Sequence, residues 1–104
     1  MEKKEIKMID DLQTALAGLK TKGEIKKFLH DLLTQQELSE LARRLRAAQI
    51  LSTKIPYTEI IKETGLSSTT VARVAKWLRS DVGGFRAVLK RNRSKSVKGK
   101  NVKV

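Results

Sequence analysis

The feature that most constrains the fold of this 104-residue sequence is a glycine set between two short segments with helical periodicity. In PYTEIIKETG the amphipathic pattern stops at Gly65, where a left-handed residue turns the chain at little cost. In the following LSSTTVARVAKWL, apolar residues return at Val71 and Val74. Two helices joined by so tight a turn predict a helix-turn-helix over about residues 57–79, with Leu66 packed in the angle between them.

The rest of the chain also carries helical periodicity. Apolar residues spaced by three or four predict a helix in IKMIDDLQTALAGLK and a second in GEIKKFLHDLL. A capping box formed by Thr34 and Glu37 opens a central helix over about residues 35–52, and a short helix in FRAVLKRN follows a break at Gly83 and Gly84. Since no segment has the alternation of a strand, we predict an all-α fold with about six helices.

The predicted core combines the central helix with the helix-turn-helix. The apolar stripe of the central helix consists of Leu38, Leu41, Leu45, Ala48 and Leu51. In the helix-turn-helix, either Ile60 or Ile61 has to pack against the valines of the second helix. We expect one helical domain over residues 1–91, followed by a basic segment over residues 92–104 that has no acids and no periodicity and is expected to be disordered.

The net charge of +12 is concentrated in the C-terminal third. Residues 1–67 contain 12 Lys and Arg against 10 Asp and Glu, whereas residues 68–104 contain 11 Lys and Arg against a single acid, Asp81. So local an imbalance indicates a polyanionic partner, with nucleic acid as the first candidate and an anionic membrane surface as the second.

Several classes of protein are excluded or disfavoured. The sequence has no apolar run long enough to span a membrane and no apolar signal-peptide core, so we expect a cytoplasmic protein that does not enter a membrane. It has no cysteine, and its single histidine, His30, lacks a set of accompanying ligands, so we expect no metal site. No arrangement of side chains suggests catalysis, and we do not expect an enzyme.

The second helix of the helix-turn-helix begins with four hydroxylated residues and continues with cations. Short side chains allow this end to approach the base edges in the major groove, and hydroxyls can donate to phosphate oxygens or bases. The predicted DNA-binding residues are Ser67, Ser68, Thr69, Thr70, Arg73, Lys76 and Arg79. The alternative is an ordinary helical hairpin in which the serines only cap a helix.

The segments LLTQQELSELARRLRAAQIL and PYTEIIKETGLSSTTVARVAKWL resemble the Trp repressor superfamily, in particular its YerC/YecD-type branch. The resemblance covers roughly residues 32–78 and implies an intertwined homodimer, in which N-terminal helices cross between subunits. It also implies a palindromic operator on double-stranded DNA, read by two recognition helices about one DNA turn, roughly 34 Å, apart.

The same resemblance implies a ligand pocket. In the family, L-tryptophan lies between the central helix and the recognition helix and adjusts the angle of the latter; by position, Thr34, Arg44 and Arg73 match its contacting threonine and two arginines. However, Val74 replaces a glycine that leaves room for the indole ring, and Trp77 replaces a serine near the amino group of the ligand. Because larger side chains at both places fill the pocket, we expect no tryptophan corepressor and no other cofactor.

The sequence therefore favours a sequence-specific, homodimeric transcriptional regulator of the repressor type. The alternative is a non-specific nucleic-acid-binding or packaging protein whose binding is driven by the basic C-terminal third. A third interpretation, an adaptor that uses the helix-turn-helix to bind protein, is disfavoured by the charge.

Overall fold

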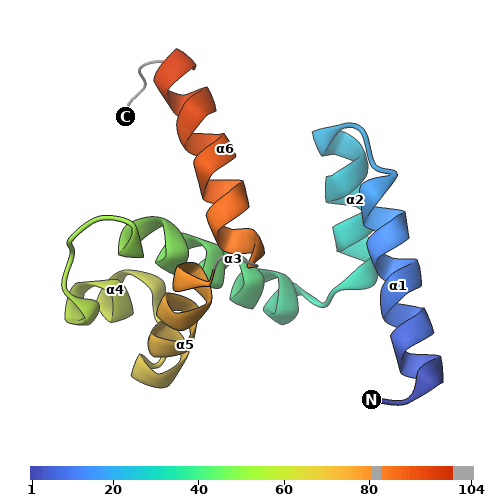
Figure 1. The fold of residues 1–104 in the computed structure, drawn as a ribbon, viewed down its shortest axis with the longest axis horizontal. Helices are drawn as coiled ribbons and strands as arrows, with labels where there is room; N and C mark the ends of the chain where they lie inside the picture. The colour runs from blue at the N-terminus through green and yellow to red at the C-terminus, as the bar shows by residue number, and fades with distance from the viewer. Residues whose placement is uncertain (81–82, 100–104) are drawn as a thin grey trace. The chain divides into compact units, whose positions relative to one another are not determined.

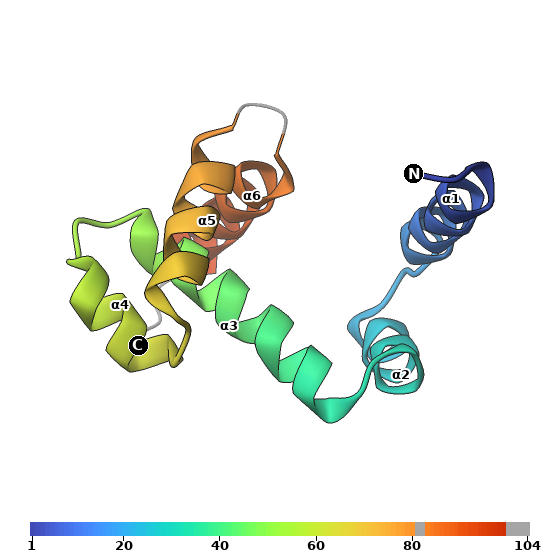
Figure 2. The same ribbon diagram turned by 90° about the horizontal axis from the view of Figure 1, so that it is seen from below.

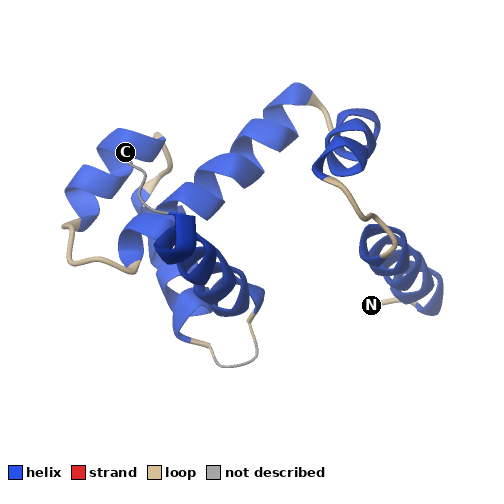
Figure 3. Ribbon diagram, turned by 90° about the horizontal axis from the view of Figure 1, so that it is seen from above, coloured by secondary structure: helices blue, strands red, loops and turns tan. Residues whose placement is uncertain are grey.

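The computed structural model describes residues 1–80 and 83–99, and all regular structure in these ranges is helical (Figure 3). The six helices are α1 Lys3–Ala17, α2 Lys22–Leu32, α3 Gln35–Leu51, α4 Tyr57–Thr64, α5 Ser68–Arg79 and α6 Gly84–Gly99. The predicted all-α fold with six helices is confirmed. The chain divides into two compact units, residues 1–38 and residues 39–104.

The first unit consists of α1, α2 and the start of α3. Thr21 caps α2 by accepting a hydrogen bond from the Glu24 amide at 3.1 Å, a cap that the sequence analysis did not identify. Within this fully described unit, no residue of α1 or α2 is buried. The apolar residues left exposed on the two helices are Ile6, Met8, Ile9, Leu12, Leu16, Ile25 and Leu32.

The predicted capping box at the start of α3 is confirmed in both directions. The Glu37 amide donates to Thr34 Oγ1 at 3.1 Å, and the Thr34 amide donates to Glu37 Oε1 at 2.8 Å. Two amides that the helix itself cannot satisfy therefore have side-chain partners, which fixes the residue at which α3 begins.

The second unit forms a small core around the C-terminal part of α3, where α4, α5 and α6 gather (Figure 1). Four helices and one turn contribute to it. The buried apolar residues of this cluster are Ala47, Ala48, Ile50, Ile60, Leu66, Val71, Val74 and Leu89. Of the two isoleucines proposed to support α5, Ile60 is the fully buried one and Ile61 packs at the edge of the cluster.

The predicted apolar stripe of α3 is partly wrong. Ala48 is fully buried, and Leu45 and Leu51 pack against the core, but Leu41 is 47% exposed. Burial instead includes Ala47, whose small side chain allows neighbouring helices to approach closely, and Ile50. Since only the last turns of α3 contact the other helices of this unit, helical periodicity alone does not reveal which part of the stripe is covered.

The predicted end of the last helix is also wrong. We expected it to stop at about Asn92, but α6 continues to Gly99, so residues 92–99 are helical rather than disordered. Its three cations, Arg93, Lys95 and Lys98, are good helix formers, and no proline interrupts the run. The remaining expectation of disorder concerns residues 100–104, which lie outside the described residues, as does Asp81.

Figure 2 shows the turn that joins α4 to α5. Backbone and side-chain hydrogen bonds close this turn. Gly65 adopts the left-handed conformation with φ of 75°, and its amide donates to the Ile61 carbonyl at 2.8 Å. The buried hydroxyl of Thr64 donates to the Ile60 carbonyl at 2.7 Å and accepts from the Leu66 amide at 3.3 Å. Leu66 is 4% exposed, as predicted for the residue that fills the angle between the helices.

We predict that Gly65→Ala destabilises the protein by about 1 kcal/mol, because a side chain disfavours the left-handed conformation. The cost is conformational rather than steric, since no described atom lies within 4 Å of a Cβ placed at Gly65. Urea denaturation followed by circular dichroism measures the change. As a control, Gly23→Ala lies inside α2 with ordinary contacts and should be neutral or stabilising; equal destabilisation by both variants contradicts the prediction.

Candidate nucleic-acid interface

The first turn of α5 divides its hydroxyl groups into two kinds. The Ser67 hydroxyl oxygen accepts from the Thr70 amide at 3.1 Å and thereby caps the helix. The Ser67 hydroxyl also donates to Thr70 Oγ1 at 3.0 Å, and Thr70 is half-buried. Ser68 and Thr69, in contrast, are exposed and form no side-chain hydrogen bond to another described residue. Ser67 and Thr70 therefore hold the helix terminus, while Ser68 and Thr69 are free to contact a ligand.

The three predicted cations follow along the same side of α5. Arg73, Lys76 and Arg79 are all exposed, and in the described part of the chain none of them forms an ion pair. The helix contains no acidic residue. Because Val71, Val74 and Ala75 are buried on the opposite side, packing directs the hydroxyls and cations together toward solvent.

The helices behind α5 support its orientation. Ile60 of α4 packs in the same buried cluster as Val71 and Val74, so the inner face of α5 is anchored along its length. Arg46 of α3 forms an ion pair with Glu63 of α4, with Nε and Oε2 2.6 Å apart. This pair is about half exposed, so it adds little energy, but it links the two helices on which α5 rests.

Trp77 is the centre of a cluster contributed by three helices. Its ring stacks on Phe85 of α6 with centroids 6.5 Å apart and an interplanar angle of 23°. The guanidinium carbon of Arg44 in α3 lies 6.0 Å from the Trp77 ring centroid, and Arg44 Nε pairs with Glu40 Oε2 at 3.2 Å. Trp77 therefore links α5 to both α3 and α6, although it remains 40% exposed.

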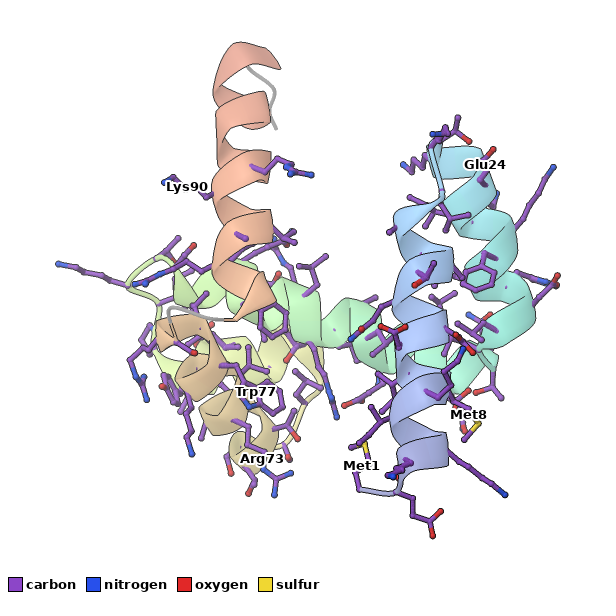
Figure 4. All side chains as sticks on the ribbon, turned by 45° about the vertical axis from the view of Figure 1, so that its right-hand side comes forward. Met1, Met8, Glu24, Arg73, Trp77 and Lys90 are labelled. Atoms are coloured by element: carbon purple, nitrogen blue, oxygen red, sulfur yellow. The ribbon has the colours of Figure 1, made fainter. Side chains whose placement is uncertain are left out.

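The residues assigned to a tryptophan pocket have other partners or lie apart. Thr34 belongs to the first unit, where both its amide and its hydroxyl serve the capping box. Arg44 lies over the Trp77 ring. Arg73 is exposed on α5, and Figure 4 shows it nearer the start of the helix than Trp77. Val74 is fully buried in the core. No contact in the described residues brings Arg44 and Arg73 together.

An apolar hollow of about 580 Å³ opens beside Trp77. Its walls come from α3, α5, α6 and the connection between the last two. The hollow is lined by Leu45, Trp77, Ser80, Gly83, Gly84, Phe85 and Val88. Since Trp77 and Val88 are 40% and 46% exposed, this surface presents large apolar side chains to solvent.

Comparison with known proteins agrees with this geometry. The sequence model of the Trp repressor protein family matches residues 7–93. YerC of Bacillus subtilis (strain 168), a protein described as uncharacterized, is 34% identical over 85 residues, which cover 82% of this chain and 82% of YerC. This chain belongs to the Trp repressor family. The sequence resemblance, including its YerC-type branch, is thereby confirmed.

A solved structure supports the same assignment. The crystal structure of a protein from Staphylococcus aureus, proposed to be a Trp repressor, matches with a TM-score of 0.76 at 27% identity. The match covers 89% of this chain and 95% of the Staphylococcus protein. The Trp repressor family is a family of helix-turn-helix DNA-binding regulators rather than of enzymes, and α4 and α5 form the corresponding unit here. No helix in the described ranges has the length and apolarity to cross a membrane.

The two kinds of hydroxyl on α5 differ in their expected effect on stability. Ser67→Ala removes the cap and should lower the free energy of unfolding by about 1 kcal/mol. Ser68→Ala, one residue further, removes an exposed hydroxyl and should change stability by less than about 0.5 kcal/mol. Chemical denaturation of the two variants measures the difference; equal stabilities contradict the assignment of Ser67 as the cap.

Proposed function

We propose that the protein is a sequence-specific transcriptional regulator, acting as a repressor, that binds double-stranded DNA through α5. The observation that carries this proposal is the division of α5 into a fully buried apolar face and an exposed face of short hydroxyls followed by cations. A helix of this kind can enter the major groove with its N-terminal turn against the bases. A transcriptional regulator has to reach the DNA, so the proposal includes the cytoplasmic location that is expected from the sequence.

The exposed side chains divide between recognition and anchoring. Ser68 and Thr69 lie at the leading turn and have hydroxyls available for base edges, and the Thr69 methyl can contact the methyl group of thymine. Arg73 lies one turn further along and can contact a phosphate or a guanine, while Lys76 and Arg79 are placed for phosphates. Ser67 and Thr70 contribute indirectly, because they fix the backbone of that turn.

A homodimer is part of the proposal. In the first unit, α1 and α2 expose apolar side chains such as Leu12 and Ile25, and a second copy of the chain can cover them. In the second unit, Leu41 is 47% exposed and the apolar hollow beside Trp77 lacks a cover among the described residues of that unit. Exposed apolar surface on this scale is typical of a subunit interface in a chain too short to bury it alone.

The protein also functions, in this proposal, without tryptophan as corepressor. Val74 occupies core volume where the family ligand requires a glycine, and the Trp77 indole already lies under the Arg44 guanidinium. In this proposal, the contact of Trp77 with Arg44 links α3 and α5 in place of the bound amino acid that the family uses. The angle of α5 is then set by folding rather than by the concentration of a ligand.

The second candidate function, non-specific nucleic-acid binding, is favoured by the basic C-terminal third. The eleven cations of residues 68–104 and their single acid give a strong attraction to any polyanion. The two candidates differ in what they require of α5: a non-specific binder needs its cations only, and a sequence reader also needs the exposed hydroxyls.

Selection from randomised duplex DNA at about physiological salt separates the two candidates, because phosphate contacts are weakened there. A sequence-specific dimer should enrich a two-fold symmetric motif with half-sites about one helical turn apart. Thr69→Ala should then lower affinity for the selected site by about tenfold, within the range of one base contact, and leave binding to unrelated DNA unchanged.

The control is Thr14→Ala, which removes an exposed threonine from α1 and should leave both affinities unchanged. Recovery of unenriched DNA contradicts sequence-specific binding. Enrichment of a motif without two-fold symmetry contradicts the dimeric arrangement while leaving sequence recognition intact.

For the corepressor, we expect isothermal titration with L-tryptophan to show no saturable heat. Affinity for the selected DNA site should likewise be the same with and without L-tryptophan, because the resemblance implies that Val74 and Trp77 take up the space of the family's ligand. Saturable, stoichiometric binding of L-tryptophan contradicts this part of the proposal.

A further inference from the structure

The second unit contains a basic hollow that the sequence pattern does not reveal. It has a volume of about 570 Å³ and lies where the ends of α3 and α5 meet α6. The basic hollow is lined by Ser52, Leu78, Arg79, Arg86, Leu89 and Lys90. Three of its six lining residues are cations, and none is an acid.

We propose that the basic hollow binds a phosphate group, supplied either by the DNA backbone or by a small phosphorylated ligand. Arg79 is the last residue of α5, and Arg86 and Lys90 lie one turn apart on α6. The cations therefore reach the hollow from two helices. A phosphate group carries several acceptor oxygens, which suit donors converging from different directions.

The state of the individual side chains supports an anion site. Arg79 and Lys90 are exposed, and neither is in an ion pair with a described residue. Arg86 has an interaction partner within the chain, so the two other cations are the principal donors. Figure 4 shows Lys90 projecting outward from α6. The Ser52 hydroxyl donates to the Gln49 carbonyl at 2.6 Å and therefore forms part of the wall.

The floor of the hollow strengthens the attraction. Leu89 is 9% exposed and Leu78 packs against the core, so one side of the site is apolar protein rather than water. A charge interaction beside a low-dielectric wall is stronger than the same interaction in open solvent. The volume exceeds that of a phosphate group, so a phosphodiester or a phosphate ester fits together with the sugar or other group attached to it.

A DNA phosphate in this hollow would extend the contact of the helix-turn-helix from α5 to α6, and this branch rests on the proposed function. A small phosphorylated ligand would instead bind between α3, α5 and α6, at the end of the recognition helix remote from its first turn. In both cases Arg86 and Lys90 belong to the binding surface, although neither is on the helix-turn-helix.

The test compares Lys90→Gln with Lys20→Gln in the full-length protein. Both substitutions remove one exposed lysine charge, but Lys20 lies outside the second unit and only its backbone amide is engaged, with Glu24. Circular dichroism should show both variants folded, since neither side chain is buried.

The first arm measures duplex DNA affinity over a range of salt concentrations. If the phosphate comes from DNA, Lys90→Gln should reduce the slope of log K against log salt concentration by about one, and Lys20→Gln should not. At about 0.15 M salt this corresponds to roughly a fivefold loss of affinity.

The second arm titrates inorganic pyrophosphate in the absence of DNA. If the ligand is small, pyrophosphate binding should be saturable in the wild type and in Lys20→Gln, and it should be at least about tenfold weaker in Lys90→Gln.

A difference between the two variants in either arm supports the site and identifies the source of the phosphate. Identical behaviour of Lys90→Gln and Lys20→Gln in both arms overturns it. Failure of the proposed function has a different signature: the wild type then enriches no DNA motif, while the pyrophosphate arm still reports on the basic hollow.

Discussion

The structure depends on the burial of the inner face of α5. Ile60, Val71 and Val74 are the largest fully buried side chains, and each contributes about 1.5–3 kcal/mol when removed from water. Leu66 completes this contact from the turn, which is possible only because Gly65 reverses the chain with a positive φ. Once this face is fixed, the rotation of α5 about its axis is fixed as well, and the exposed positions on its other face follow from helical geometry alone.

Features with a local physical cause could be predicted from the sequence. The capping box of Thr34 and Glu37, the left-handed Gly65 and a serine cap at the start of α5 depend on atoms a few residues apart, and the helices they bound begin and end within about one residue of expectation. Features that depend on contacts between residues far apart in the sequence could not be predicted in this way. Periodicity placed Leu41 on the core side of α3, but which turns of α3 other helices cover is decided by tertiary packing. The extent of α6 was also missed, because a segment without an amphipathic pattern can still be helical, as residues 92–99 are.

The candidate site shows the same division. Of the seven residues predicted to bind DNA, Ser67 caps α5 and the other six lie on it, but the separation of Ser67 and Thr70 from Ser68 and Thr69 needed hydrogen-bond geometry. The cluster around Trp77 combines residues of α3, α5 and α6, and the basic hollow combines residues of α5 and α6 with Ser52, which follows α3. These residues are far apart in sequence. These two features lie against different residues of α5, Trp77 in one and Leu78 and Arg79 in the other. The orientation of α5 therefore depends on α3 and α6 as much as on α4, its partner in the helix-turn-helix.

The magnitudes connect the small number of exposed hydroxyls to the proposed dimer. If Ser68 and Thr69 each discriminate by about 1 kcal/mol, the low end for a base contact, one copy of α5 separates specific from non-specific DNA by only about 2 kcal/mol from hydroxyl contacts. Regulators of this class achieve about 4–10 kcal/mol. Two copies on a symmetric operator double the difference and reach the lower end of that range. Cations that contact phosphates add affinity for every sequence equally, so a larger charge cannot replace the second copy. A chain with two exposed hydroxyls on its recognition helix therefore needs a partner, or an arginine contact to guanine through Arg73, to act as a specific regulator.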